Sequence, residues 1–318
     1  MSFYGDYSVE ADAPDAETLT EGEYATETYD GGSRLNNTFE DAYESDGGKD
    51  QVTGIENLNS IPHYLRVCNI MAFIFQFLQA GALGYLASQA ETSWPIYVNF
   101  PANFDEREGN EAFGVPEPTE VANFSVTWYS CVFMALSGID HLLVCSPGIV
   151  KKYNFYIERH QNPFRWAEYS LSASLMRVMI AQLSGVTDIH LLFAIFVLTA
   201  TTMVMGSVHE STNAVARADG YRQNWYSFLG AWIPHMSSWF IIFCYFFVAV
   251  SRGDPPLFVW FIIFVLFVLD GCFALLFYLQ WGKIGIFRDY VKGEIGFIIL
   301  SFTAKTALAW INFFGGSR

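Results

Sequence analysis

Charged side chains are scarce in this sequence of 318 residues. Only 15% of the residues are Asp, Glu, Lys or Arg, whereas a soluble domain has about one quarter. Basic residues are the scarcer kind, with 17 Lys and Arg against 32 Asp and Glu, and the net charge is −15. The low charge argues against a water-soluble enzyme, and the negative balance argues against a nucleic-acid partner.

The acidic residues are concentrated near the N-terminus. Residues 1–60 contain 15 acidic and 2 basic residues, hence a net charge of −13, which leaves −2 for the rest of the chain. This first segment lacks the apolar area that would offset its ordering entropy. We therefore predict an acidic disordered cytoplasmic tail over 1–60 and a membrane domain over 61–318.

Cysteine and catalytic motifs are also sparse. The chain has five cysteines, an odd number, and all of them lie in apolar runs, so they are expected to be small packing residues and not a disulfide framework. We find no metal-ligand cluster, catalytic domain or glycine-rich phosphate loop. Neither an enzyme nor a metal site is predicted.

Long apolar runs are abundant, because 52% of the residues are hydrophobic and 18% are aromatic. A helix needs about 20 mostly apolar residues to cross the hydrocarbon of a bilayer. The runs do not alternate as the strands of a membrane barrel do. We predict an all-α bundle of seven transmembrane helices, over 64–88, 122–146, 163–184, 187–208, 223–250, 256–281 and 293–314.

The basic residues indicate the orientation of this bundle. The N-terminal segment and the loops on its side hold twelve Lys and Arg, and the opposite loops hold three. The positive-inside rule then places the N-terminus in the cytoplasm and the C-terminus outside. The longest loop, 89–121, is expected on the outer face, where its β-rich segment from Trp94 to Phe100 predicts a short hairpin.

Lys305 is the least expected charge in these spans, because it lies near the middle of the seventh. An unpaired charge there costs about 2.5–3.5 kcal/mol or more, so intramembrane ionisable residues are functional candidates. The alternative is a lysine that only extends toward the interface. An amine in an apolar pocket can instead form a Schiff base with an aldehyde, since desolvation favours its neutral form.

A buried cation needs a counterion, and Glu168 in the third span is the best candidate. Ser172 follows Glu168 by four residues and Ser301 precedes Lys305 by four, so each hydroxyl shares a helix face with its charged neighbour. The alternative is that Glu168 pairs with Arg165 near the helix end.

Several motifs together resemble heliorhodopsin, a retinal-binding family of seven-helix proteins distantly related to microbial rhodopsins. The resemblance covers roughly residues 60–315 and is carried by Ser301-Phe-Thr-Ala-Lys305, Arg165-Trp-Ala-Glu168-Tyr-Ser and Asp140-His141-Leu-Leu-Val. It implies a light-absorbing photoreceptor with all-trans retinal on Lys305 as a protonated Schiff base. Glu168 would be its counterion, and Ser172 and Ser301 would adjust the hydrogen bonding.

The resemblance also indicates which other side chains meet the chromophore and its proton. Further pocket residues are expected to be Tyr169, Ala173, Met176 and Trp239. His141 matches a family histidine implicated in taking up the Schiff-base proton, and Gln76 is the nearest match to the second histidine of that site. Glutamine does not titrate near neutrality, so this chain departs from the two-histidine acceptor of the family.

Proton pumping of the usual design is not predicted. Retinal pumps carry a carboxylate four residues before the lysine, where this chain has Ser301, and an acid eleven residues after the first counterion, where it has Met179. A slow sensory photocycle therefore fits better. The alternative is a light-gated passive proton channel or transporter that uses His141 and the acids Asp140, Glu210 and Asp270.

The remaining expectations concern partners. The resemblance implies a homodimer in the plasma membrane, and the acidic tail suggests an unknown cytosolic signalling partner. A remote alternative is a transporter without a chromophore. The absence of an inverted repeat argues against it.

Overall fold

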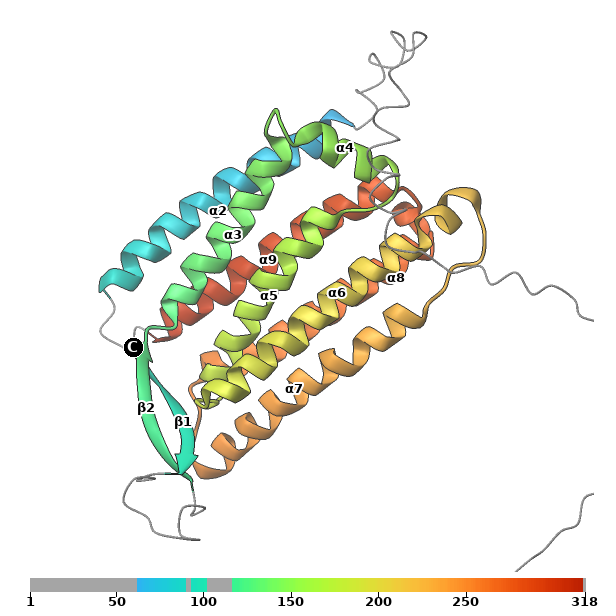
Figure 1. Cartoon of the computed structure of the whole chain (residues 1–318). Coiled ribbons are helices and arrows are strands. Elements are labelled where there is room, and N and C mark those ends of the chain that lie inside the picture. Colours follow the sequence, from blue (N-terminus) through green and yellow to red (C-terminus); the bar gives the residue numbers. More distant parts are fainter. Residues whose placement is uncertain (1–61, 90–92, 102–115, 317–318) are drawn as a thin grey trace, which may run out of the picture. The chain divides into compact units, whose positions relative to one another are not determined.

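The computed structural model describes residues 62–89, 93–101 and 116–316. The predicted tail over 1–60 lies outside them, so its disorder stays a prediction. Within the described residues, seven helices have 19 residues or more (Figure 1). They are α2 (His63–Gln89), α3 (Thr127–Cys145), α5 (Pro163–Leu183), α6 (Ile189–Asp219), α7 (Tyr226–Arg252), α8 (Leu257–Trp281) and α9 (Tyr290–Gly316).

The long helices form one bundle in which chain neighbours mostly pack together (Figure 1). Helix α2 packs on α3, α3 on α5, α5 on α6, α6 on α7, and α8 on α9. Helix α9 also returns to contact α2 and α3, and α5 contacts α8. The predicted seven-helix membrane fold is confirmed.

Helix α5 differs from the other six long helices. Those six are long and apolar enough to cross a membrane, whereas α5 carries Arg165, Glu168 and Arg177 within 21 residues. Of those 21 residues, 14 are buried in the protein. Because α5 is covered by other helices and not by lipid, its side chains can be polar wherever a partner is available.

Several helix boundaries differ from the predicted spans. Helix α3 begins at Thr127 and not at 122, because the preceding residues belong to a β-strand. Helix α6 continues to Asp219, well beyond the predicted end at 208, and stops at Gly220, which has a φ of 80°. A left-handed glycine is a common helix terminator. Two short elements were not predicted, α4 (Val150–Glu158) and the 3₁₀ helix η4 (Gly285–Arg288).

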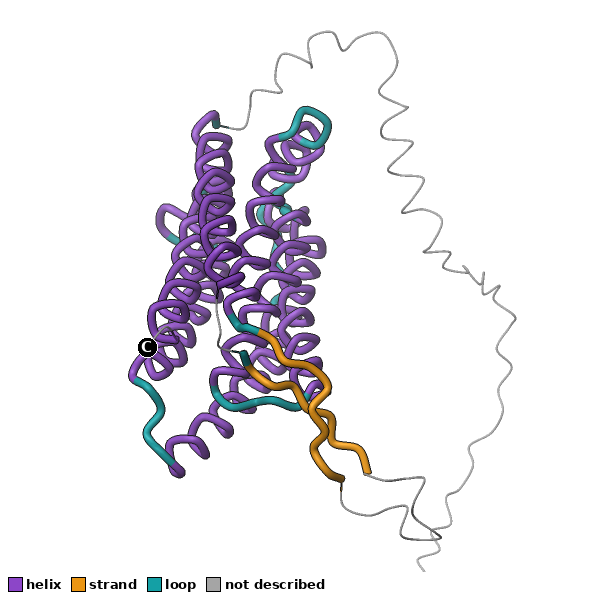
Figure 2. Tube along the Cα trace, turned by 90° about the vertical axis from the view of Figure 1, so that its left-hand side faces the viewer, coloured by secondary structure: helices purple, strands orange, loops and turns teal. Residues whose placement is uncertain are grey.

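The predicted hairpin is present. Strands β1 (Trp94–Pro101) and β2 (Pro116–Phe124) pair antiparallel, with an irregularity between Ile96 and Tyr97. The hairpin lies at the opposite end of the bundle from α4 (Figure 1), and Figure 2 shows both strands together at one end of the helices. It is attached to the start of α6, because the Tyr97 amide donates to Thr187 O at 2.9 Å and Asn99 Nδ2 donates to Asp188 Oδ2 at 2.6 Å.

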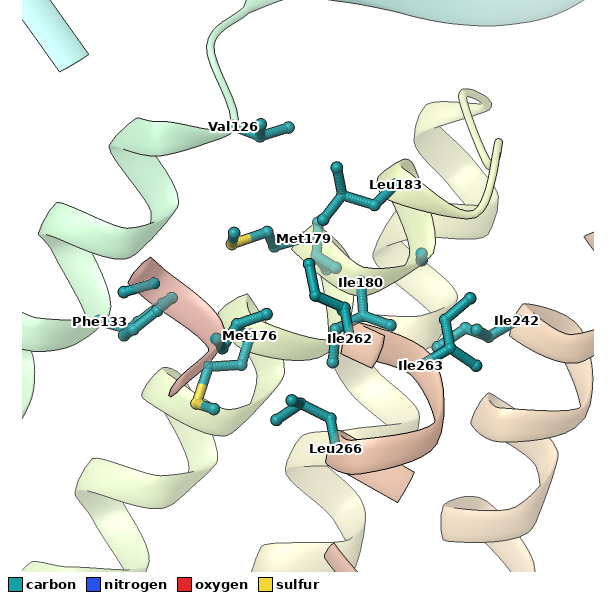
Figure 3. Close-up of a cluster of buried hydrophobic side chains, with 14 of the residues drawn as sticks. Val126, Phe133, Met176, Met179, Ile180, Leu183, Ile242, Ile262, Ile263 and Leu266 are labelled. Carbon is teal, nitrogen blue, oxygen red and sulfur yellow. The ribbon is translucent and has the colours of Figure 1, made fainter. Parts of the chain in front are cut away.

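An apolar core fills the half of the bundle nearer the hairpin. Met176, Met179 and Ile180 of α5 belong to one buried cluster with side chains of α3, α7 and α8 (Figure 3). Phe133 of α3 and Leu266 of α8 are among them, and both are almost fully buried. Helix α5 is therefore held on several sides by close packing, which fixes the positions of its polar side chains.

Helices α5 and α6 approach closely at Gly206. A Cβ atom at this position would lie 2.3 Å from the Trp166 ring, whose side chain is buried. We predict that Gly206→Ala destabilises the protein by about 1–3 kcal/mol, because the indole has to move within a packed core. The matched control is Gly271→Ala in α8, where nothing lies within 4 Å of the added atom.

The measurement is the midpoint of thermal unfolding in detergent. Gly271→Ala is expected to keep or slightly raise the midpoint, since alanine favours helix by about 0.5–1 kcal/mol over glycine. Equal midpoints for Gly206→Ala and Gly271→Ala would contradict the close packing of α5 on α6.

Candidate functional site

Lys305 of α9 is buried, with 2% of its surface exposed. Its Nζ atom donates to Ser301 Oγ at 2.8 Å, one helical turn earlier. It also lies 3.0 Å from Glu168 Oε1 and 3.3 Å from Glu168 Oε2 on α5. The geometry predicted for the lysine, the carboxylate and the Ser301 hydroxyl is thus present.

Glu168 has a second donor that the sequence analysis missed. Ser137 Oγ of α3 donates to Glu168 Oε1 at 2.6 Å. Ser172, expected to act at this point, instead has a buried hydroxyl with no hydrogen-bond partner in the described part of the chain. The only signal for Ser137 was its place one turn before Asp140, and that spacing alone does not reveal a contact with another helix.

The alternative pairing of Glu168 with Arg165 is wrong. Arg165 Nη2 lies 2.5 Å from Glu210 Oε1 of α6, and Arg165 Nη1 lies 2.8 Å from Glu294 Oε1 of α9. Two carboxylates thus balance Arg165. Glu168 therefore remains available to Lys305.

Glu210 belongs to a buried polar network and is not an interfacial acid. Only 1% of its surface is exposed, and its Oε2 accepts the backbone N–H of Asn162 at 2.9 Å. Asn162 Nδ2 donates to Glu294 Oε2 at 2.7 Å, and the Tyr290 hydroxyl donates to Glu210 Oε1 at 3.3 Å. This network joins α5, α6 and α9 near the α4 end of the bundle. It gives each buried charge the several partners that a buried charge needs.

A large cavity lies beside Lys305 between α5, α6, α7, α8 and α9. The space between its lining atoms is about 1050 Å³, a volume that includes open surroundings. The predicted pocket residues that line it are Tyr169, Ser172, Ala173, Met176, Ser301 and Lys305.

Of the two aromatic residues predicted for this cavity, Tyr169 lines it and Trp239 does not. Trp239 is fully buried but is not among the lining residues, and its Nε1 donates to Asp270 Oδ2 at 3.1 Å. Its helix turns the indole toward α8, behind the cavity wall. The other aromatic lining residues, four of them on α7 and α8, are Trp166, Phe228, Trp232, Phe273, Phe277 and Phe297.

A small polar cavity lies on the other side of the lysine. Its lining includes Asp140, His141 and Glu168, and it shares Tyr169, Phe297 and Ser301 with the large cavity. The Lys305–Glu168 pair therefore lies between an apolar cavity and a polar one. The lysine nitrogen can therefore contact a large apolar ligand on one side and exchange protons with polar groups on the other.

The partner of His141 is Asn69 of α2, and not Gln76. His141 Nδ1 lies 2.8 Å from Asn69 Oδ1. Gln76 is two turns further along α2, fully buried, and neither polar atom of its amide has a partner within the described residues. Asn69 was missed because one sequence does not show which turn of α2 reaches α3.

Asp270 lies apart from the other predicted proton-path acids. It lines the large cavity, where it pairs with Arg177 of α5. Arg177 thus pairs with an acid of another long helix, whereas Asp188 caps α6 by accepting the Leu191 amide at 2.9 Å. Asp140 and His141 line the small cavity, and Glu210 lies beyond it beside Arg165.

Comparison with known protein families gives a match over most of the chain. The family model described as Heliorhodopsin matches residues 65–316. No curated protein matches the chain.

Two solved structures are similar to this chain in fold. One is a light-driven proton pump from Leptosphaeria maculans, with a TM-score of 0.54 and 12% identity, over 81% of this chain and 98% of that one. The other is the light-driven proton pump rhodopsin of Coccomyxa subellipsoidea, with a TM-score of 0.50 and 13% identity, over 80% of this chain and 97% of that one. Identities this low show the fold alone. The family match spans most of the chain, and the chain therefore belongs to the heliorhodopsin family of retinal-binding, multi-pass membrane proteins.

Proposed function

We propose that this chain is a photoreceptor in which all-trans retinal is bound covalently to Lys305 and Glu168 balances the resulting positive charge. The observation that carries the proposal is the buried contact of Lys305 Nζ with Glu168 Oε1, at 3.0 Å, beside the large cavity. Lys305 would hold retinal through a C=N bond formed with loss of water, and Glu168 would be the anion that balances a proton on the nitrogen.

The residues of the large cavity fit such a ligand. The lining is mainly apolar and aromatic, as an extended polyene requires. The Ser172 hydroxyl is buried at the cavity without a partner in the described residues, which leaves a donor or acceptor for a bound group. When bound, retinal supplies visible-light absorption and isomerisation about a double bond.

The residues around the nitrogen hold its proton. Glu168 accepts hydrogen bonds from Lys305 and from Ser137, and Ser301 Oγ accepts another from Lys305. Charge-assisted hydrogen bonds in a water-poor site are strong, so the proton is held firmly before illumination. The nearest polar groups beyond Glu168 are those of the small cavity, where Asp140 and His141 lie.

We propose further that the light response is sensory and does not pump ions. The two similar solved structures are proton pumps by their titles. This chain has a hydroxyl at Ser301 and a thioether at Met179, the two positions where the resemblance to retinal pumps predicts acids. Met179 is fully buried, and its sulfur lies 3.6 Å from Ser130 Oγ. Neither Ser301 nor Met179 can take up and release a proton at neutral pH as a carboxylic acid does.

A passive, light-gated proton path is the second candidate. It is favoured by one observation, the small cavity that places Asp140 and His141 next to Glu168. The Arg165 network borders this cavity and would complete a polar route toward the α4 end.

The remaining proposals concern the orientation of the chain in the membrane and its partners. Exposed Lys151, Lys152 and Arg159 lie in or beside α4, which supports a cytosolic location for that end and for the N-terminus. We also propose a homodimer in the plasma membrane, a cytosolic signalling partner and no enzymatic activity.

The lysine assignment predicts that Lys305→Ala expressed with all-trans retinal loses all visible absorbance, because no other amine borders the cavity in the described residues. The matched control is Lys292→Ala, which removes a lysine that is 53% exposed near the start of the same helix and should leave the band unchanged. The measurement is the absorption spectrum of purified protein. A normal visible band in Lys305→Ala would falsify the covalent assignment.

The counterion assignment predicts that Glu168→Gln shifts the visible band to the red. Without the carboxylate, the ground state with its charge at the nitrogen is less stabilised, and the energy gap falls. Glu210→Gln removes an acid that contacts Arg165 and not the lysine, so its shift should be much smaller. Equal shifts in the two variants would mean that Glu168 is not the specific counterion.

The sensory assignment predicts no steady photocurrent in voltage-clamped cells that express the protein. A current that persists against the proton gradient would contradict the argument from Ser301 and Met179. A current that reverses with the gradient would instead establish the passive path, and it should then be reduced in Asp140→Asn.

A further inference from the structure

Two ion pairs border the large cavity, and only one of them is used by the proposed function. The first is Lys305 with Glu168. The second joins Arg177 of α5 to Asp270 of α8, and both of its members line the cavity wall. No signal in the sequence linked these two residues.

The second pair is held in place by neighbouring groups. Trp239 Nε1 donates to Asp270 Oδ2, the same oxygen that accepts from Arg177 Nη2. The Arg177 guanidinium carbon lies 4.3 Å from the centre of the Trp239 ring. Arg177 is 3% exposed, and its Nη1 atom has no hydrogen-bond partner within the described chain. Both charges are therefore fixed beside the cavity, with one guanidinium donor unused.

The position of the pair along α5 places it away from the lysine. Arg177 follows Glu168 by nine residues, which corresponds to a rise of about 13–14 Å along the helix. That separation is comparable with the length of a polyene that starts at Lys305. A ligand attached there and filling the cavity would have one ion pair at its nitrogen and the other near its far half.

We propose that Arg177 and Asp270 form a second electrostatic element of the chromophore site, which sets the wavelength that the protein absorbs. This inference rests on the proposed binding of retinal to Lys305. It assigns to Asp270 the role of a fixed charge that faces the ring half of the chromophore, and not that of a proton carrier.

The physical reason is the movement of charge on excitation. In a protonated polyene imine, absorption shifts positive charge from the nitrogen toward the ring. A carboxylate near the ring stabilises the excited state and lowers the energy gap, whereas a guanidinium raises it. These effects are strong because the cavity is apolar and screens charges poorly. In the intact pair, the effects of the carboxylate and the guanidinium on the energy gap largely cancel. Removing either group leaves the effect of the other.

The fixed hydrogen bonds also argue against proton transfer by Asp270. Its carboxylate accepts from a guanidinium and from an indole, and these two donors hold the accepting oxygen in place. Arginine stays charged under all ordinary conditions. The pair is therefore a static dipole in the wall of the cavity.

The experiment compares absorption spectra of retinal-loaded Asp270→Asn, Arg177→Gln and the double variant with the wild type. Asp270→Asn leaves the guanidinium alone and is expected to shift the band to the blue. Arg177→Gln leaves the carboxylate alone and is expected to shift it to the red. The double variant should return close to the wild-type maximum, whereas purely steric effects would not cancel in this way.

The matched control and a second readout separate this role from simple loss of structure. Asp188→Asn removes an acid that caps α6 and does not line the cavity, and it should not move the band. In the retinal-free protein, Asp270→Asn should lower the thermal midpoint by on the order of 10 °C, because it leaves a buried cation unpaired. An unchanged midpoint would mean that the ion pair is not formed.

The outcomes distinguish the two proposals. If the wild type binds retinal and is coloured but Asp270→Asn and Arg177→Gln do not shift the band, or shift it in the same direction, this inference is overturned and the proposed function stands. If the wild type stays colourless with retinal, the proposed function fails and this inference fails with it.

Discussion

The structure depends on one constraint, that a charge buried in the apolar bundle needs partners: the charges of α5 have opposite charges within reach, and the buried Arg217 of α6 donates to backbone carbonyls. Helix α5 supplies one member of each interior pair described above. Arg165 contacts Glu210 and Glu294, Glu168 contacts Lys305, and Arg177 contacts Asp270. An isolated buried charge costs several kcal/mol, so each contact restrains the helices that carry its partners. Ion pairs as well as apolar contacts therefore hold α6, α8 and α9 against α5.

This arrangement separates the roles of the charges. Arg165 pairs with two carboxylates near the α4 end, so Glu168 remains available to pair with the lysine. Because Lys305 and Glu168 lie between an apolar and a polar cavity, one nitrogen can face a large apolar ligand and still exchange a proton with neighbouring groups. The two similar solved structures are proton pumps by their titles and share only the fold with this chain, so the fold by itself does not indicate the output.

Part of the site could be predicted from single residues and their helical spacing. Lys305 and Glu168 stood out because charges in the middle of apolar spans are costly, and Ser301 followed from the four-residue spacing on one helix face. Ser137 and Asn69 could not be found in this way. Each acts through a contact between helices, with Glu168 and His141 respectively, and helical periodicity shows which residues share a face but not which helix that face meets.

The sequence by itself determined the seven long helices, the hairpin, the family and the lysine with its carboxylate. These features depend on hydrophobic length, local spacing and the few charges in apolar runs, all of which are local properties. Only the tertiary structure decided the partners of Arg165 and Arg177, the absence of Trp239 from the cavity wall and the division of the polar residues between two cavities. The physical reason is that such contacts join residues far apart in the chain, and their rotation and depth are set by the packing of several helices at once.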